Sequence, residues 1–86
     1  MPKVIASDDF LELLDRLPAN LRERTHGKLL LLADNPRHPS LRVKRVTDTK
    51  GIWEASVTMG VRITFEWQGD RIILRKIGPH DILKNP

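Results

Sequence analysis

Hydrophobic side chains in the first half of the chain recur at the spacing of an amphipathic helix. Ser7 and the two aspartates that follow it are typical of a helix N-cap and an acidic first turn. The apolar positions after them are Phe10, Leu13, Leu14 and Leu17. Pro18 ends this helix and begins a second one, which must end at Asn35-Pro36. The pattern therefore predicts two antiparallel helices, preceded by a short edge strand over residues 3–6.

After Pro39 the apolar side chains alternate with polar ones, which is the period of a β-strand. We expect a strand that begins at residues 41–43, followed by strands over residues 53–58, 62–67 and 72–75. Gly69-Asp70 predicts a two-residue hairpin turn. A three-residue loop over residues 59–61 keeps the apolar side chains on one face, and Gly60 is expected to supply its positive φ. In this register Thr64 lies opposite Arg75, and Arg62 lies opposite Ile77.

The two patterns together predict a single α+β domain over residues 1–86. Its two antiparallel helices pack on one face of a twisted antiparallel sheet of three to four C-terminal strands, with the short N-terminal strand beside them. Trp53 and Trp67 fall on the covered face, which indicates packing. The other sheet face is expected to be open and polar. Ile73 and Ile77 also fall on it, so the C-terminal segment is expected to cover part of that face.

Composition places this domain in a reducing compartment and gives it a basic second half. The 86 residues include no cysteine, which excludes disulfides and thiol catalysis and predicts a cytoplasmic protein. We expect neither a membrane span nor a secretory signal, because no apolar run is long enough. Residues 37–86 carry ten basic and five acidic side chains of a chain with net charge +4. This bias indicates a polyanionic partner or, as the alternative, a solvated basic surface.

The candidate chemistry lies at Arg62 and His80. The expected register places His80 just past the end of the strand beside Arg62, at the rim of the open face. A guanidinium can hold a phosphate by two hydrogen bonds, and an imidazole can transfer a proton near neutral pH, so the pair suits phosphodiester chemistry. Alternatively, Arg62 pairs with Glu54 or Glu66, and His80 is a loop residue.

Two further patterns bear on ligands. Arg42, Lys44 and Arg45 form a basic run that could bind a nucleic-acid backbone or could protect an exposed edge strand. The three histidines lie far apart in the sequence, without carboxylates at ligand spacing, so no metal site is predicted.

Four segments together resemble the RelE/ParE superfamily of bacterial type II toxins, over nearly the whole chain. They are "LLADNPRHPSLRVKRV" at 31–46, "GIWEASV" at 51–57, "VRITFEW" at 61–67 and "ILRKIGPHD" at 73–81. The resemblance to the RelE-like branch implies a ribosome-dependent endoribonuclease in which the 2′-hydroxyl attacks the adjacent phosphate without a metal or other cofactor. It implies that Arg62 stabilises the phosphate and that His80 assists the leaving 5′-oxygen.

The chain departs from the family pattern at several site positions. RelE has lysines where this chain has Glu54 and Ser56, so Glu54 is a candidate general base or, as the favoured alternative, a surface ion-pair partner of Arg62. Many relatives end in a tyrosine, and Lys84 occupies about that position here. The general base is therefore unassigned, and we expect weak or no cleavage of free RNA. Four arginines and lysines are the candidate RNA contacts: Arg42, Lys44, Arg45 and Arg75.

The resemblance leaves two other functions open. ParE-like relatives bind DNA gyrase instead of cutting RNA, and a degenerate member would only bind a partner. Under the toxin interpretation the expected partners are a cognate antitoxin protein and the ribosome with its mRNA. Neither membrane binding nor sequence-specific DNA binding without the antitoxin is expected.

Overall fold

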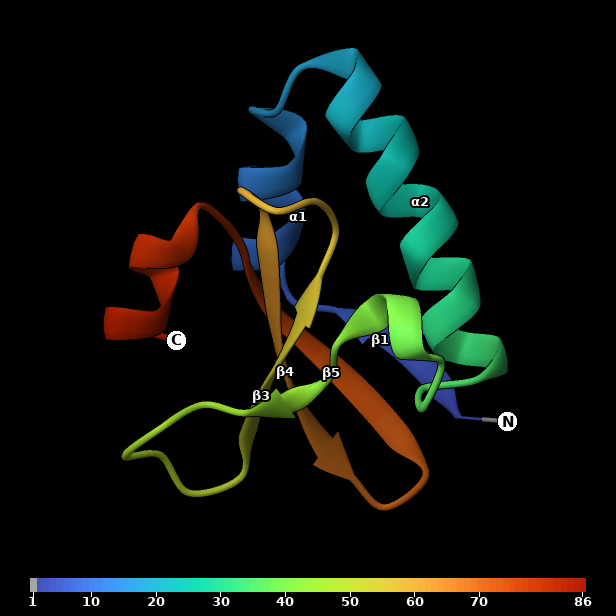
Figure 1. Ribbon diagram of the computed structural model, residues 1–86, viewed down its shortest axis with the longest axis vertical. Coiled ribbons are helices and arrows are strands. Elements are labelled where there is room, and N and C mark those ends of the chain that lie inside the picture. The colour runs from blue at the N-terminus through green and yellow to red at the C-terminus, as the bar shows by residue number, and fades with distance from the viewer. Residues whose placement is uncertain (1) are drawn as a thin grey trace.

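The computed structural model describes residues 2–86 as a five-stranded sheet with two helices on one face (Figure 1). The strands are β1 (Lys3–Ala6), β2 (Lys44–Arg45), β3 (Ile52–Ser56), β4 (Arg62–Gln68) and β5 (Arg71–Gly78). The helices are α1 (Asp8–Asp15) and α2 (Ala19–Asp34), with two short 3-10 helices, η1 (Pro39–Leu41) and η2 (His80–Lys84). The α+β fold class and the two N-terminal helices are confirmed. Within residues 2–86, none of the helices is both long and apolar enough to span a membrane.

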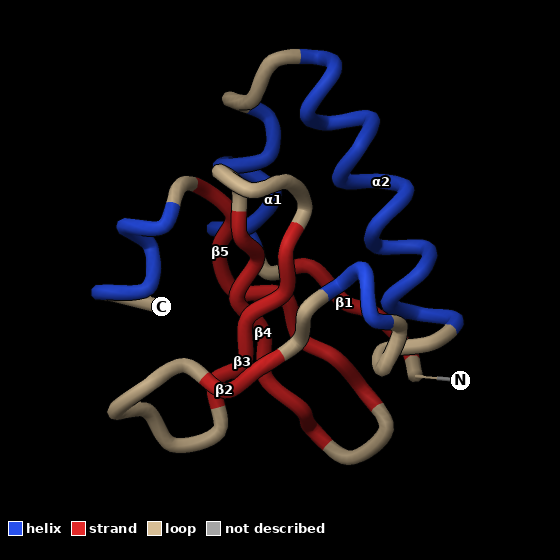
Figure 2. The backbone as a smooth tube through the Cα atoms, in the orientation of Figure 1, coloured by secondary structure: helices blue, strands red, loops and turns tan. Residues whose placement is uncertain are grey.

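The sheet is mixed, whereas the sequence pattern predicted an antiparallel one with fewer strands. Its order is β1-β5-β4-β3-β2, and β1 runs parallel to β5 at one edge while the other neighbours are antiparallel. The expected edge position of β1 is confirmed. Figure 2 shows how the chain leaves β1 through both helices before it reaches β2 at the opposite edge. This long connection allows β1 and β5 to be parallel, because a tight hairpin joins only antiparallel strands.

A side-chain cap marks the start of α1, and a proline marks the start of α2. The hydroxyl oxygen of Ser7 accepts the N–H of Phe10 at 3.1 Å and donates to the carbonyl oxygen of Arg75 at 3.1 Å. Ser7 therefore caps α1, as predicted, and also ties the helix to β5. Pro18 directly precedes α2, which ends at Asp34, just before Asn35-Pro36.

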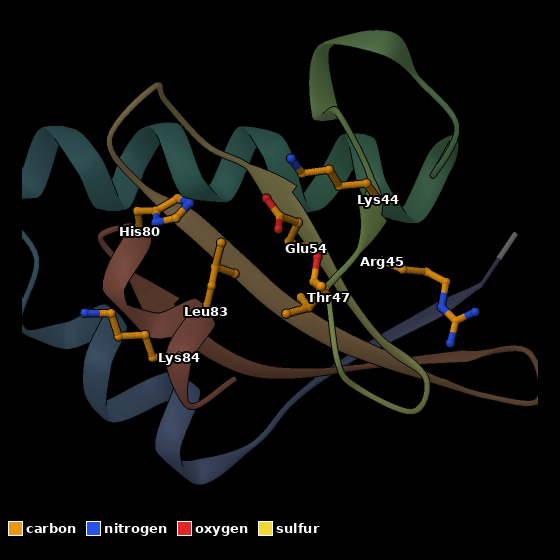
Figure 3. Close-up of a pocket in the computed structure, with 8 residues that line it drawn as sticks. Lys44, Arg45, Thr47, Glu54, His80, Leu83 and Lys84 are labelled. Carbon is orange, nitrogen blue, oxygen red and sulfur yellow. The ribbon is translucent and has the colours of Figure 1, made fainter.

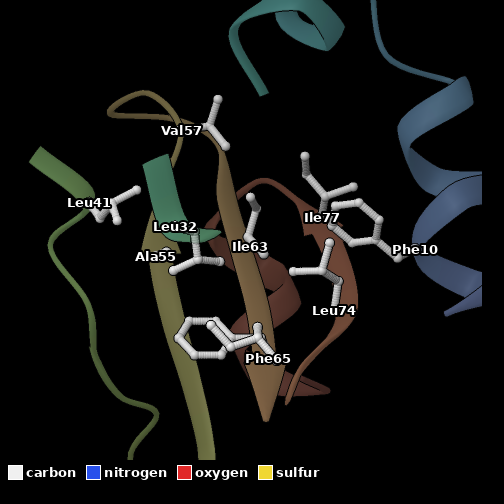
Figure 4. Close-up of a cluster of buried hydrophobic side chains, with 10 residues drawn as sticks. Phe10, Leu32, Leu41, Ala55, Val57, Ile63, Phe65, Leu74 and Ile77 are labelled. Carbon is white, nitrogen blue, oxygen red and sulfur yellow. The ribbon is translucent and has the colours of Figure 1, made fainter. Parts of the chain in front are cut away.

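The core lies between the helices and the predicted apolar face of the sheet (Figure 4). Phe10 of α1 and Leu32 of α2 pack against the strands, and both are buried. The other buried members are Leu41, Ala55, Val57, Ile63, Phe65, Ile72, Leu74 and Ile77. Trp53 packs against this cluster but is only half-buried. Trp67 contacts Phe65 edge-on, yet 40% of it is exposed, so its predicted packing role holds only in part.

A β-bulge corrects the predicted register between β4 and β5. The hairpin end is as expected, with Trp67 opposite Ile72. Between Thr64 and Phe65 the register shifts, so that Thr64 lies opposite Lys76 instead of Arg75. The extra residue on β5 reverses which side chains face the helices. Ile77 consequently points into the core, where it is 2% exposed, and the prediction that it lies on the open face is wrong.

The same bulge places Gly78, not Ile77, opposite Arg62. Thr64 explains how the bulge is held. Its buried hydroxyl oxygen accepts the N–H of Lys76 at 3.1 Å, which satisfies a donor that the interrupted ladder leaves unpaired.

The turn between β3 and β4 has the predicted length but a different position. Val57 donates its N–H to the carbonyl oxygen of Val61 at 2.9 Å, so the loop comprises residues 58–60. This moves the strand pairing by two residues, which leaves the faces unchanged. Gly60 does not supply a positive φ. Instead, the hydroxyl oxygen of Thr58 accepts the N–H groups of Gly60 and Val61. Gly69 has a φ of 62° in the confirmed two-residue turn.

The strand expected to begin at residues 41–43 is present as β2, but its predicted start is wrong. Leu41 lies in η1, and Arg42 adopts a left-handed conformation with a φ of 49°, so pairing starts only at Lys44. Leu41 belongs to the core and Val43 packs against it, although neither residue lies in a strand.

The C-terminal segment covers part of the polar sheet face, as predicted. The main-chain oxygen of Pro86 accepts hydrogen bonds from the hydroxyl of Thr64 and from Nε of Arg75, each at 3.1 Å. The ammonium group of Lys76 donates to the carbonyl oxygen of Asn85 at 2.6 Å. These contacts hold η2 and the residues after it against the sheet.

Candidate functional site

A pocket of about 350 Å³ opens on the polar face between the β2–β3 edge and η2 (Figure 3). Its volume is at the small end of the range of ligand-binding pockets. Six polar or charged residues and two apolar ones line it: Lys44, Arg45, Val46, Thr47, Glu54, His80, Leu83 and Lys84. Three of the four residues predicted to be catalytic are among them.

Glu54 is the buried charge at this site. It lies on β3 between Lys44 of β2 and Thr64 of β4 in the strand register, and only 5% of it is exposed. Its Oε1 atom is 3.7 Å from Nε of Arg62. The favoured sequence interpretation, an ion pair with Arg62, is confirmed. Glu54 is buried and Arg62 is partly buried, so the pair does not lie on the surface, and removal of either partner leaves the other charge uncompensated.

Arg62 lies on the polar face, beside the pocket lining and away from the helices. Its Nη1 atom donates to the carbonyl oxygen of Thr58 at 2.7 Å, and its side chain is 19% exposed. A guanidinium carries five N–H donors. Thr58 and Glu54 occupy two sides of the group, which fixes its orientation and leaves donors for another anion.

His80 reaches the pocket from the other side. It is the first residue of η2, and its side chain is exposed. In Figure 3 the imidazole of His80 and the carboxylate of Glu54 lie on either side of Leu83. Arg62 and His80 are thus both neighbours of Glu54, one through the ion pair and the other across the pocket.

Gly78 allows η2 to pack this closely. A Cβ atom at this position would lie 2.9 Å from Cγ2 of Ile82. Because Gly78 also lies opposite Arg62 in the sheet, the close approach brings the start of η2 next to the Arg62 strand.

The predicted RNA contacts do not form one surface. Lys44 lines the pocket, as does Lys84, whose ammonium group points outward in Figure 3. The guanidinium of Arg45 extends away from the pocket in the same view and lies 5.9 Å from the centre of the Trp53 ring. Arg42 borders a separate groove. Arg75 donates to Pro86, and its Nη1 atom lies 3.6 Å from Oε2 of Glu66.

Sequence reasoning missed the contributions of Thr47 and Leu83 to the pocket and that of Thr64 beneath the C-terminal segment. For Leu83 a signal was present, because it lies three residues after His80, which places both on one face of a 3-10 helix. Nothing in the strand pattern distinguished Thr64 from the other polar positions. Across residues 2–86, no three histidine, aspartate or glutamate side chains gather as a metal site requires.

The structure is similar to several solved toxins. A YoeB/ParE toxin from Agrobacterium tumefaciens has a TM-score of 0.74 and 15% identity, over 91% of this chain and 98% of that one. YafQ from E. coli has a TM-score of 0.75 and 16% identity, over 96% and 98% of the two chains. The archaeal RelE of a RelE-RelB complex from Pyrococcus horikoshii has a TM-score of 0.73 and 18% identity, over 91% and 93%.

No protein-family model matches the chain, and no curated protein matches its sequence. The comparisons therefore show that this chain has the fold of RelE-, YoeB- and YafQ-type toxins. The resemblance stated from the sequence is confirmed at that level.

Proposed function

We propose that this protein is the toxin of a type II toxin–antitoxin system and a RelE-like, ribosome-dependent mRNA endoribonuclease. The observation that carries the proposal is the pocket on the polar face, where Glu54 has Arg62 beside it and His80 opposite. The shared fold supports the same conclusion. The partners that follow are a cognate antitoxin and the translating ribosome, and the place of action is the cytoplasm.

The proposed reaction is a transesterification that needs only proton transfers. The 2′-oxygen of the RNA attacks the adjacent phosphorus, and the bond from phosphorus to the 5′-oxygen breaks. His80 gives a proton to the leaving 5′-oxygen, which departs as a hydroxyl group. The free donors of Arg62 bind the non-bridging oxygens, whose negative charge grows in the transition state. The products are a 2′,3′-cyclic phosphate and a 5′-hydroxyl.

Glu54 has two roles in this proposal. Its ion pair holds Arg62 in place. Among the described residues of the pocket, Glu54 also provides the carboxylate that can accept the 2′-hydroxyl proton. The same ion pair already engages this carboxylate, because Oε1 lies 3.7 Å from Nε of Arg62. We therefore expect the isolated protein to cut free RNA slowly and the ribosome to complete the site.

Growth arrest and message cleavage after induced expression test the proposal. Removal of a general acid lowers a rate by about 10²- to 10⁴-fold, so His80→Ala is expected to abolish both effects. Arg62→Lys keeps a positive charge beside Glu54 but loses the bidentate donors, and it is expected to lose cleavage while remaining folded. The matched controls are His26→Ala and Arg71→Ala, since both residues are exposed and lie outside the pocket.

Each alternative function predicts a different outcome. If the His80 and Arg62 variants both still arrest growth and DNA supercoiling fails in vitro, the protein is a gyrase inhibitor and the nuclease proposal is wrong. If the wild-type protein causes no growth defect and leaves messages intact, it is a binding-only member of the fold.

A further inference from the structure

A second groove lies at the β2 edge, away from the pocket that contains His80. It is bordered by the segment that joins α2 to β2 and by Trp53 of β3. Two arginines, a histidine and a tryptophan give it its chemical character. The lining residues are Pro36, Arg37, His38, Pro39, Arg42, Val43 and Trp53.

The groove has positive charge that no carboxylate neutralises. Residues 35–47 contain five basic or histidine side chains and no aspartate or glutamate. The ion pairs within residues 2–86 engage Arg16, Arg62 and Arg75, so neither Arg37 nor Arg42 has an acidic partner there. Both arginines are exposed, and the left-handed backbone of Arg42 projects it at the turn into β2. These guanidinium groups are available to an external anion.

Trp53 supplies a flat apolar surface beside those charges. One part of the ring packs against the core, and the remainder is exposed at the groove. The guanidinium of Arg45 lies 5.9 Å from the ring centre. An aromatic ring flanked by guanidinium groups is the arrangement on which unpaired nucleobases stack in proteins that bind single strands.

The β2 strand connects the two sites. Successive side chains of a strand point to opposite faces, and the register pairs Lys44 with Glu54 and Arg45 with Trp53. Lys44 therefore belongs to the polar-face pocket, and Arg45 belongs to the Trp53 side. A polyanion that crosses this edge strand would contact both.

We propose that the Trp53 groove binds single-stranded nucleic acid, with one base stacked on Trp53 and the neighbouring phosphates held by Arg42 and Arg37. If the proposed function is correct, this nucleic acid is the RNA that continues from the cleavage pocket. Only its identification as that RNA rests on the proposed function. An acidic peptide would also satisfy the arginines, but its carboxylate side chains offer no ring to the tryptophan. A nucleotide satisfies both features.

Fluorescence quenching of Trp53 tests the proposal directly. Trp67→Phe leaves Trp53 as the tryptophan of the chain, and adding His80→Ala prevents turnover of the probe. This double variant is titrated with an eight-nucleotide single-stranded RNA, the matching DNA, inorganic polyphosphate and a polyglutamate peptide. We expect both oligonucleotides to quench the signal, and polyphosphate to bind more weakly and without quenching.

Substitutions separate stacking from charge. The Kd for a labelled oligonucleotide is measured by fluorescence anisotropy. Trp53→Leu is expected to raise this Kd by about 5- to 150-fold, which corresponds to the loss of one stacked base. Trp53→Phe keeps a ring in the core and is expected to recover most of this loss. Arg42→Ala is expected to lower the slope of log K against log salt by about one, whereas Arg24→Ala, on an exposed part of α2, leaves it unchanged.

Two results would overturn the inference. One is equal affinity for polyphosphate and oligonucleotide with no effect of Trp53→Leu, which would mean charge binding alone. The other is quenching by polyglutamate in preference to nucleic acid, which would identify a peptide site. If the groove binds RNA but the proposed function is wrong, the result is a different one. RNA then still quenches the fluorescence of Trp53, but the protein with His80 intact cuts no message.

Discussion

Replacing Gly78 with alanine tests whether the close contact between β5 and η2 builds the candidate site. The added Cβ would lie 2.9 Å from Cγ2 of Ile82, about 0.6 to 1.1 Å inside the usual separation of non-bonded carbons. Gly78 has no positive φ, so alanine fits the backbone and the side-chain contact is the obstacle. Either Ile82 must change its packing, or η2 must move away from the sheet.

The expected magnitude follows from two opposing effects. Overpacking costs about 1–3 kcal/mol, and removing a glycine from a strand returns about 0.5–1 kcal/mol. We therefore expect Gly78→Ala to lower the free energy of unfolding by up to about 2.5 kcal/mol. Because η2 carries His80, message cleavage should fall by more than this loss of stability explains.

A double-mutant cycle measured by urea unfolding isolates the contact. Ile82→Ala removes the atom that the new Cβ meets, so the double variant should be more stable than the sum of the single effects by at least about 1 kcal/mol. Gly27→Ala is the matched control, since nothing lies within 4 Å of its added Cβ, and it should stabilise the helix by up to about 1 kcal/mol. Additive effects at positions 78 and 82 would refute the reasoning.

Two further substitutions test the contacts that hold the C-terminal segment and the first helix. Thr64→Val leaves the Lys76 amide unsatisfied and should cost about 1–3 kcal/mol, with faster amide exchange at Lys76, whereas Thr64→Ser should keep that amide protected. Equal exchange in both variants would contradict this role. Ser7→Ala should cost about 0.5–2 kcal/mol in urea unfolding, because it removes the cap of α1 and the bond to Arg75. A change within the error of the measurement would show that the cap contributes nothing.

The elements that the sequence predicted well are those with a strong local signal. The helix after Ser7 has a cap, acidic residues and a complete apolar stripe, and the turn at Gly69 has a two-residue motif. The strand faces followed from alternation alone, except in the part of β5 that follows the bulge. This is why a pairing error of two residues between β3 and β4 left the core unchanged.

What the sequence pattern missed depended on contacts between distant residues. The bulge beside Thr64 is stabilised by a hydroxyl that bonds across to Lys76, and no alternation rule contains that bond. The parallel pairing of β1 is likewise set by the path through both helices. For the site, the bulge made the predicted partner of Arg62 wrong by one residue but still left His80 near that strand.

The ion pair between Arg62 and Glu54 was predictable because both residues face the polar side of neighbouring strands. It was not predictable that Arg42 and Arg75 lie outside the pocket and that the guanidinium of Arg45 extends away from it. These positions depend on a left-handed residue, on a cation–π contact with Trp53 and on a hydrogen bond to Pro86.

The most direct test of the central claim is to map the ends of a message incubated with purified ribosomes and the wild-type or His80→Ala protein. We predict 2′,3′-cyclic phosphate and 5′-hydroxyl ends on ribosome-bound message, slow cleavage of the same RNA without ribosomes, and at least about a hundredfold loss of cleavage with His80→Ala. Cleavage that is unchanged by the substitution, or ends that carry a 3′-hydroxyl and a 5′-phosphate, would contradict it.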